Sequence, residues 1–150
     1  MDPASELLLQ APTEVRLGPA GDAPEQSARS HLGDGRCISW SPRSLPPGLH
    51  VALDAELADR CVPAALSVWA GGLPSAVFWE RWTRVETSCK LREVPVVLWL
   101  RRHGLHEDPA LALRTFRHGP AVVTCGAAHR QDVTGLLTAG GERPRPASVG

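Results

Sequence analysis

The segment Trp69–Leu98, WAGGLPSAVFWERWTRVETSCKLREVPVVL, is the most informative part of this chain about its fold. It runs into an apolar stretch, Val94–Leu100, that is rich in β-branched residues and has Pro95 at its second position. Such a stretch is typical of a buried strand. Since proline cannot donate to a β-ladder, we predict a core strand with Pro95 at its start or at a sheet edge.

Strict alternation of apolar and polar residues predicts a second strand at Leu49–Leu57, directly after the turn-like sequence Pro46-Pro47-Gly48. A helix is the alternative, because alanine, leucine and glutamate are good helix formers. The regular alternation and the preceding turn favour the strand. Leu66 and Val68 continue the same alternation.

Shorter apolar runs predict further strands at Leu7–Leu9, Val15–Leu17 and Ala121–Thr124. Only Asp108–Leu113 has a helix-start pattern, an N-cap residue followed by proline at the first helical position. Many short strands separated by proline and glycine favour an all-β fold, a sandwich or barrel with little helix.

The length of 150 residues suits a single domain. We expect short N-terminal strands and a loop in residues 1–30, one β domain in residues 31–139, and a flexible tail in residues 140–150. The tail sequence GGERPRPASVG has no apolar pattern.

Composition excludes several classes of protein. A hydrophobic content of 43% and a charged content of 21% are those of a globular chain, and a net charge of zero argues against a general nucleic-acid binder. The first residues, MDPASELLLQAP, lack the basic and long apolar parts of a signal peptide, and no apolar run has the roughly 20 residues of a membrane span. We therefore expect an intracellular protein of the cytoplasm or nucleus, without membrane contact.

The cysteines stand far apart in the sequence, with no C-x-x-C pair, at Cys37, Cys61, Cys89 and Cys125. Zinc sites usually take their ligands in close pairs, so no metal site is expected, and the thiols should stay reduced in an intracellular protein. The segment His103–Asp108 places two histidines and two carboxylates together, and a solvated loop is favoured there over a metal or acid-base site.

Several short motifs resemble the dUTP pyrophosphatase (dUTPase) family. Pro46-Pro47 matches a turn before a strand, Gly72-Leu73 the end of a serine motif, and Val94–Leu98 a following strand, while Phe116–Val123 matches a glycine turn and its strand. The resemblance covers roughly residues 33–125. It implies a dUTPase-like β jelly-roll or barrel and a homotrimer.

The catalytic side chains of that family are replaced at the matching positions. Its first-motif aspartate falls at Arg36, its serine at Gly71, its water-activating aspartate at Thr87 and its tyrosine at Lys90. Glu86 would replace the aspartate only if the alignment slips by one or two residues. The remnant positions are therefore Arg36, Gly71, Gly72, Glu86, Thr87 and Lys90, and no cofactor is expected.

The resemblance implies an inactive relative of the degenerate viral proteins of herpesviruses and adenoviruses, which act on host proteins. We therefore expect an accessory protein that works through an unidentified protein partner. One alternative is a divergent active dUTP pyrophosphatase that uses Mg²⁺, with Glu86 as base and Gly71-Gly72 holding phosphate through backbone N–H groups. The other is an orphan protein with no ordered function.

Candidate contacts for a partner are Trp79 and Trp82, with Arg81 and Arg84 beside them. Exposed tryptophan next to arginine is typical of interface hot spots. The alternative is that these tryptophans fill the core, as large aromatic residues usually do.

Overall fold

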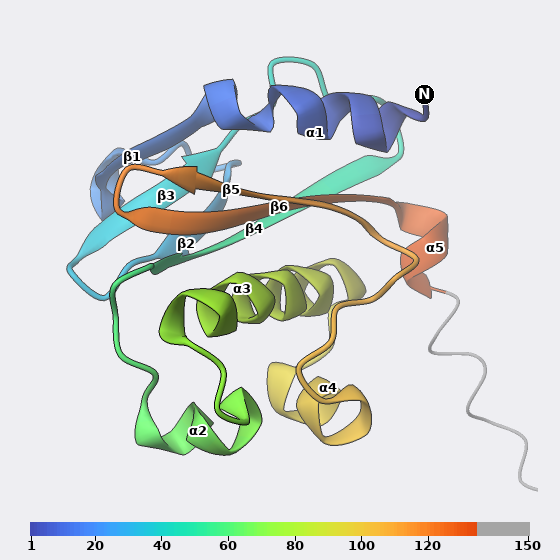
Figure 1. Ribbon diagram of the computed structural model, residues 1–150. Coiled ribbons are helices and arrows are strands. Elements are labelled where there is room, and N and C mark those ends of the chain that lie inside the picture. The colour runs from blue at the N-terminus through green and yellow to red at the C-terminus, as the bar shows by residue number, and fades with distance from the viewer. Residues whose placement is uncertain (135–150) are drawn as a thin grey trace, which may run out of the picture.

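The computed structural model describes residues 1–134 and has a mixed α/β fold. In chain order, its elements are α1 (Pro3–Glu14), β1 (Val15–Pro19), a 3₁₀ helix η1 (Ala20–Asp22), β2 (Ala28–His31), β3 (Arg36–Trp40), β4 (Leu49–Leu57), α2 (Ala64–Ala70), α3 (Ser75–Arg92), α4 (Val96–His103), β5 (Ala112–His118), β6 (Ala121–His129) and α5 (Arg130–Thr134). Figure 1 shows these elements along the chain.

The prediction of an all-β fold with little helix is wrong, because the central segment folds as helices. The expected strand at Val94–Leu100 is largely α4. Glu93, with a φ of 55°, ends α3 in the left-handed region, and Pro95 caps the next helix. In α4, Val96, Trp99 and Leu100 pack inward at helical spacing. Short apolar runs do not by themselves distinguish helix from strand.

Two other expected strands are also helical. Leu7–Leu9 lies in α1, which begins where the Asp2 carboxylate accepts hydrogen bonds from the N–H groups of Ala4 and Ser5 at 3.0 and 3.1 Å. Leu66 and Val68 lie in α2. The helix expected from Asp108 is absent. Its carboxylate instead accepts from Ala110 N at 2.9 Å in a turn that leads into β5.

The strands predicted at Leu49–Leu57, Val15–Leu17 and Ala121–Thr124 are confirmed as β4 and as parts of β1 and β6. They belong to two antiparallel three-stranded sheets, with strand orders β1-β3-β2 and β4-β6-β5. The β2 strand crosses the boundary expected at residue 30, and β1 and β2 both pair with β3. The tail expected in residues 140–150 lies outside the described residues.

Helices cover the two faces of the β4-β6-β5 sheet. Figure 1 shows α1 on one face and α3 on the other, with α2 and α4 beyond α3. The face toward α1 is an apolar core that includes Leu53, Ala55, Val123 and Cys125. A second core joins α2, α3 and α4 around Trp79, Trp82 and Trp99.

One long-range contact stabilises α1 despite a proline inside it. Pro12 has no N–H group, so the carbonyl of Leu8 loses its helical partner. Arg114 on β5 donates to that carbonyl at 3.1 Å and to the carbonyl of Leu9 at 2.8 Å. The helix can therefore run to Glu14 over the sheet. No helix in the described part of the chain is long and apolar enough to cross a membrane.

Candidate functional site

The remnant positions inferred from the dUTPase resemblance are spread over the molecule. Arg36 begins β3 and pairs with Asp34 at 2.6 Å. Gly71 and Gly72 form the turn after α2, with φ values of 55° and 80°. Glu86, Thr87 and Lys90 share the helix α3. The jelly-roll that the resemblance implied is absent, so the correspondences drawn from it define no common site.

The tryptophans expected at an exposed hot spot are buried. Trp79 is 1% exposed and donates its indole N–H to the carbonyl of Arg60 at 2.6 Å, while Trp82 is 7% exposed. Of the two arginines, Arg81 is exposed, whereas Arg84 binds Glu107 and Thr115 at 3.1 and 3.0 Å. These four residues therefore do not form one surface patch.

The first chemically distinctive place is a polar interface between α3 and β4. The Asp54 carboxylate, on the α3 side of β4, accepts from Lys90 Nζ at 2.8 Å and from Ser30 Oγ at 3.2 Å. Lys90 Nζ also donates to the carbonyl of Leu53 at 2.8 Å. The side chain of Asp54 is 9% exposed and that of Lys90 is 38% exposed. The ion pair thus joins a buried carboxylate to an ammonium at the protein surface.

Two further carboxylates lie near this pair. Glu56 follows Asp54 on the same face of β4 and pairs with Arg60 at 3.2 Å. Glu86 lies one turn before Lys90 on α3. Burial, followed by the charge of Asp54, raises the pKa of Glu86 to about 7. Burial likewise raises the pKa values of Asp54 and Glu56. Such perturbed carboxyls mark functional-site candidates.

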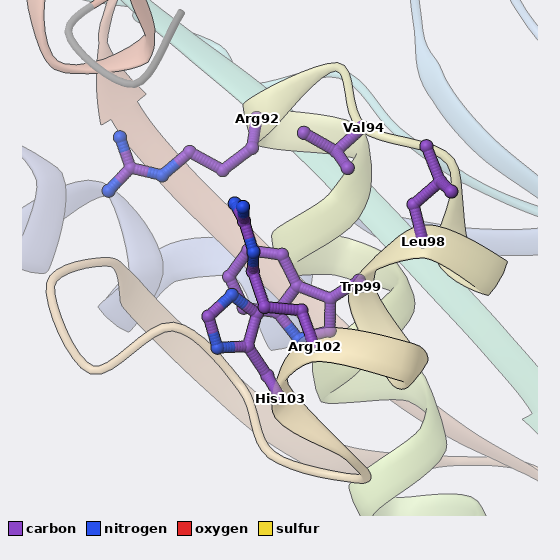
Figure 2. A pocket seen from close by; sticks show the side chains of 6 residues that line it. All are labelled: Arg92, Val94, Leu98, Trp99, Arg102 and His103. Atoms are coloured by element: carbon purple, nitrogen blue, oxygen red, sulfur yellow. The ribbon is translucent and has the colours of Figure 1, made fainter. Parts of the chain in front are cut away.

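The second distinctive place is a cavity of about 320 Å³ at the corner of α3 and α4, the α3–α4 pocket. Figure 2 shows its lining, which is formed by Arg92, Val94, Leu98, Trp99, Arg102 and His103. Most of the wall is apolar. The indole of Trp99 packs against the ring of His103, with centroids 4.4 Å apart, and donates to the carbonyl of His106 at 2.8 Å.

The local sequence explains how the pocket forms. α3 ends at Arg92, and the turn through Val94 and Pro95 reverses the chain into α4. Arg92 is fixed by Asp108, which accepts from its Nε at 2.8 Å, and by the carbonyl of Asp132. Asp108 is held in turn by its N–H, which donates to Ser88 Oγ at 3.2 Å. These hydrogen bonds therefore position Arg92 in the wall of the pocket.

The rim of the pocket is positively charged. Arg102 and His103 stand in the last turn of α4 beside Arg101, and α4 has no acidic residue. No ion pair to Arg101 or Arg102 is found within residues 1–134. Exposed apolar side chains of α4 lie at and beside the pocket, since Val97 and Leu98 are 55% and 56% exposed. The surface therefore combines apolar area with free cationic groups.

The histidines and carboxylates of His103–Asp108 have separate roles. His103 packs on Trp99, Asp108 holds Arg92, and Glu107 pairs with Arg84. No group of three potential metal-ligating side chains occurs in the described residues. The cysteines are free thiols there, and burial raises the pKa of Cys89 to about 12.

Comparison with protein-family models, characterised proteins and solved structures finds no match for this chain. The candidate sites therefore stand on geometry alone. Sequence reasoning missed Asp54 as the partner of Lys90, and it missed the pocket entirely. The polar positions of the β4 alternation were the only sequence signal for Asp54.

Proposed function

We propose that this protein is a binding module that recognises a partner protein through the α3–α4 pocket and carries out no catalysis of its own. The pocket itself is the observation that supports this proposal: an apolar cavity with Arg92 held in its wall and a cationic rim. Ligand sites are typically concave and apolar with a few placed polar groups.

The apolar wall and cationic rim of the α3–α4 pocket indicate what kind of partner segment would bind. An apolar side chain of the partner would enter the cavity against Leu98 and Trp99, where it loses contact with water. Acidic residues beside that anchor would meet Arg102 and His103 at the rim. Complementary charge speeds encounter and rejects basic partners. The expected ligand is therefore a protein segment with an apolar anchor flanked by acidic residues.

Fluorescence polarisation with a labelled short peptide, two leucines flanked by glutamates, tests this function. The wild-type chain should bind it, and a matched peptide with lysines in place of the glutamates should not bind. Leu98→Ser and Arg102→Glu should each weaken binding roughly tenfold, since about 1.4 kcal/mol corresponds to a factor of ten.

The controls lie on other surfaces of the same helical region. Arg81→Glu changes an exposed arginine of α3 outside the pocket, and Val68→Ser changes a 75% exposed apolar residue of α2. Both should leave binding unchanged. Equal binding of the lysine peptide, or an equal loss in Arg81→Glu and Arg102→Glu, would overturn the proposed function.

A further inference from the structure

The interface between α3 and β4 has more negative charge than its own cations balance. Asp54 and Glu56 face α3 from β4, and Glu86 and Lys90 face β4 from α3. Arg60, in the turn after β4, pairs with Glu56. With all groups ionised, three carboxylates face two cations.

The residues that face Asp54 from β6 and β2 are uncharged, and His50 lies further along the same face of β4. On β6 the residue paired with Asp54 is Thr124, and β2 contributes the hydroxyl of Ser30. The thiol of Cys89 lies near Glu86 on α3 and stays protonated, since burial raises its pKa to about 12. The excess negative charge therefore stays within the group.

Both Asp54 and Glu86 have carboxylate oxygens without a hydrogen-bond partner in the described residues. Asp54 Oδ1 receives Lys90 and Ser30, but Asp54 Oδ2 is buried and has no hydrogen-bond partner in the described residues. Glu86 is half-buried, and none of the hydrogen bonds within residues 1–134 involves its carboxylate. Leaving a buried charged oxygen unpaired is costly, and a proton taken up from solvent removes that cost.

We propose that Asp54, Glu86 and Lys90 form a proton-responsive contact between α3 and β4, in which uptake of one proton from solvent by the two carboxylates tightens the seating of α3. Loss of that proton leaves two anions for one ammonium and loosens the helix. This contact acts in the free protein and needs no ligand.

The direction in which stability changes with pH follows from the direction of the pKa shifts. The pKa of Glu86 is raised from its usual 4.5 to about 7, chiefly by burial, and that of Asp54 is raised for the same reason. A raised carboxyl pKa stabilises the folded state fully below the usual value, and that stabilisation is lost as pH rises through the folded value. For Glu86, the loss falls between about pH 4.5 and 7.

The same contact is continuous with the α3–α4 pocket. Lys90 and Arg92 stand in the last turn of α3, where one side chain binds Asp54 and the other lines the pocket. Loosening the end of this helix would displace Arg92. The pH range of this contact would then set the range in which the pocket keeps its shape.

Amide hydrogen exchange tests the proposal, with Glu86→Gln as the variant and Glu80→Gln as the control. Glu80 is exposed on the same helix. Measured at the same pH of 8, exchange in residues 83–92 should be at least about tenfold slower in Glu86→Gln than in the wild type, because the pKa of Glu86 is raised from 4.5 to about 7 and a difference of one in pKa is a factor of ten. At pH 5 the two proteins should agree, and strands β1–β3 should not differ at either pH.

Amide exchange in Glu80→Gln should match that of the wild type at both pH values. As a second readout, wild-type protection of residues 83–92, corrected for intrinsic exchange, should fall from pH 5 to pH 8 relative to that of β1–β3. Equal protection of α3 in the wild type and Glu86→Gln at pH 8, or a wild-type protection independent of pH, would overturn the proposal.

Discussion

The two faces of the β4-β6-β5 sheet differ in kind, although both are covered by a helix. Toward α1 the strands present Leu53 and Val123 within an apolar core. Toward α3 the next residues along the same strands are Asp54 and Thr124, both buried and both hydrogen-bonded. Most buried polar groups in proteins are hydrogen-bonded, because an unpaired one is costly. The α1 face is therefore apolar here, while the α3 face combines apolar contacts, such as Val122 with the α3 core, with groups that can respond to pH.

Packing on the α3 face also requires that the helix approach β6 closely. Gly126 on β6 lies under α3, where a side-chain Cβ would come within 2.8 Å of Leu91 and Thr87 and 2.7 Å of Leu113. Thr83 and Thr124 join helix and strand by hydroxyl groups 2.9 Å apart. Glycine lets the helix sit close enough for these bonds.

The largest expected effect lies on the apolar face. Leu53 is 1% exposed in the core under α1. Leu53→Ala should lower the free energy of unfolding by about 2–5 kcal/mol, because a cavity is added to the lost burial. Urea denaturation followed by tryptophan fluorescence measures the change. A loss below about 1 kcal/mol would show that this face is loosely packed.

The next effect tests close packing on the α3 face. Gly126→Ala should lower the free energy of unfolding by about 1–3 kcal/mol through overpacking against α3. The control is Gly18→Ala on β1, where a Cβ has nothing within 4 Å. Thermal unfolding of both variants provides the comparison, and equal midpoints would contradict the close approach of α3.

A comparable or smaller effect is expected from removing the cation. Lys90→Met leaves Asp54 buried without its ammonium partner and should cost about 1–3 kcal/mol at pH 7.5. The cost should shrink at pH 5, where the carboxyls of the group take up protons. Urea denaturation at both pH values measures this loss of stability. A loss that grows toward pH 5 would refute the role of Lys90 as the ionic partner of Asp54.

The smallest effect belongs to Asp54→Asn. The substitution removes an ion pair together with its desolvation cost, and these two changes largely cancel. We expect a change under about 1 kcal/mol at pH 7, with a weaker dependence of stability on pH than in the wild type. Paired with Leu53→Ala, its neighbour in β4, this variant compares the two faces directly. Similar losses in both would remove the distinction between them.

The sequence predicted the sheet better than the helices. Alternation was clear at Leu49–Leu57 because β4 is apolar on one face and polar on the other over most of its length. In α3, the residues Phe78, Trp82, Val85 and Cys89 follow a helical period that was present in the sequence. The valine-rich run after it favoured a strand, and only packing of Trp99 and Leu100 against α3 selects the helix.

The candidate site was less accessible to sequence reasoning. Glu86, Thr87 and Lys90 were singled out, but for a chemistry that depended on a different fold. Asp54 and Lys90 stand far apart in the chain and meet only when α3 packs on β4. The α3–α4 pocket likewise arises from the turn at Pro95 and from Arg92 fixed by Asp108, two features of tertiary packing.

The most direct test of the central distinction between the two faces is a ¹³C NMR titration of the Glu86 carboxyl in the folded protein. We predict a midpoint near pH 7, and a lower midpoint in Asp54→Asn, because the charge of Asp54 contributes to the raised pKa of Glu86. A midpoint near the ordinary value of 4.5 in the wild type, unchanged in Asp54→Asn, would contradict this prediction.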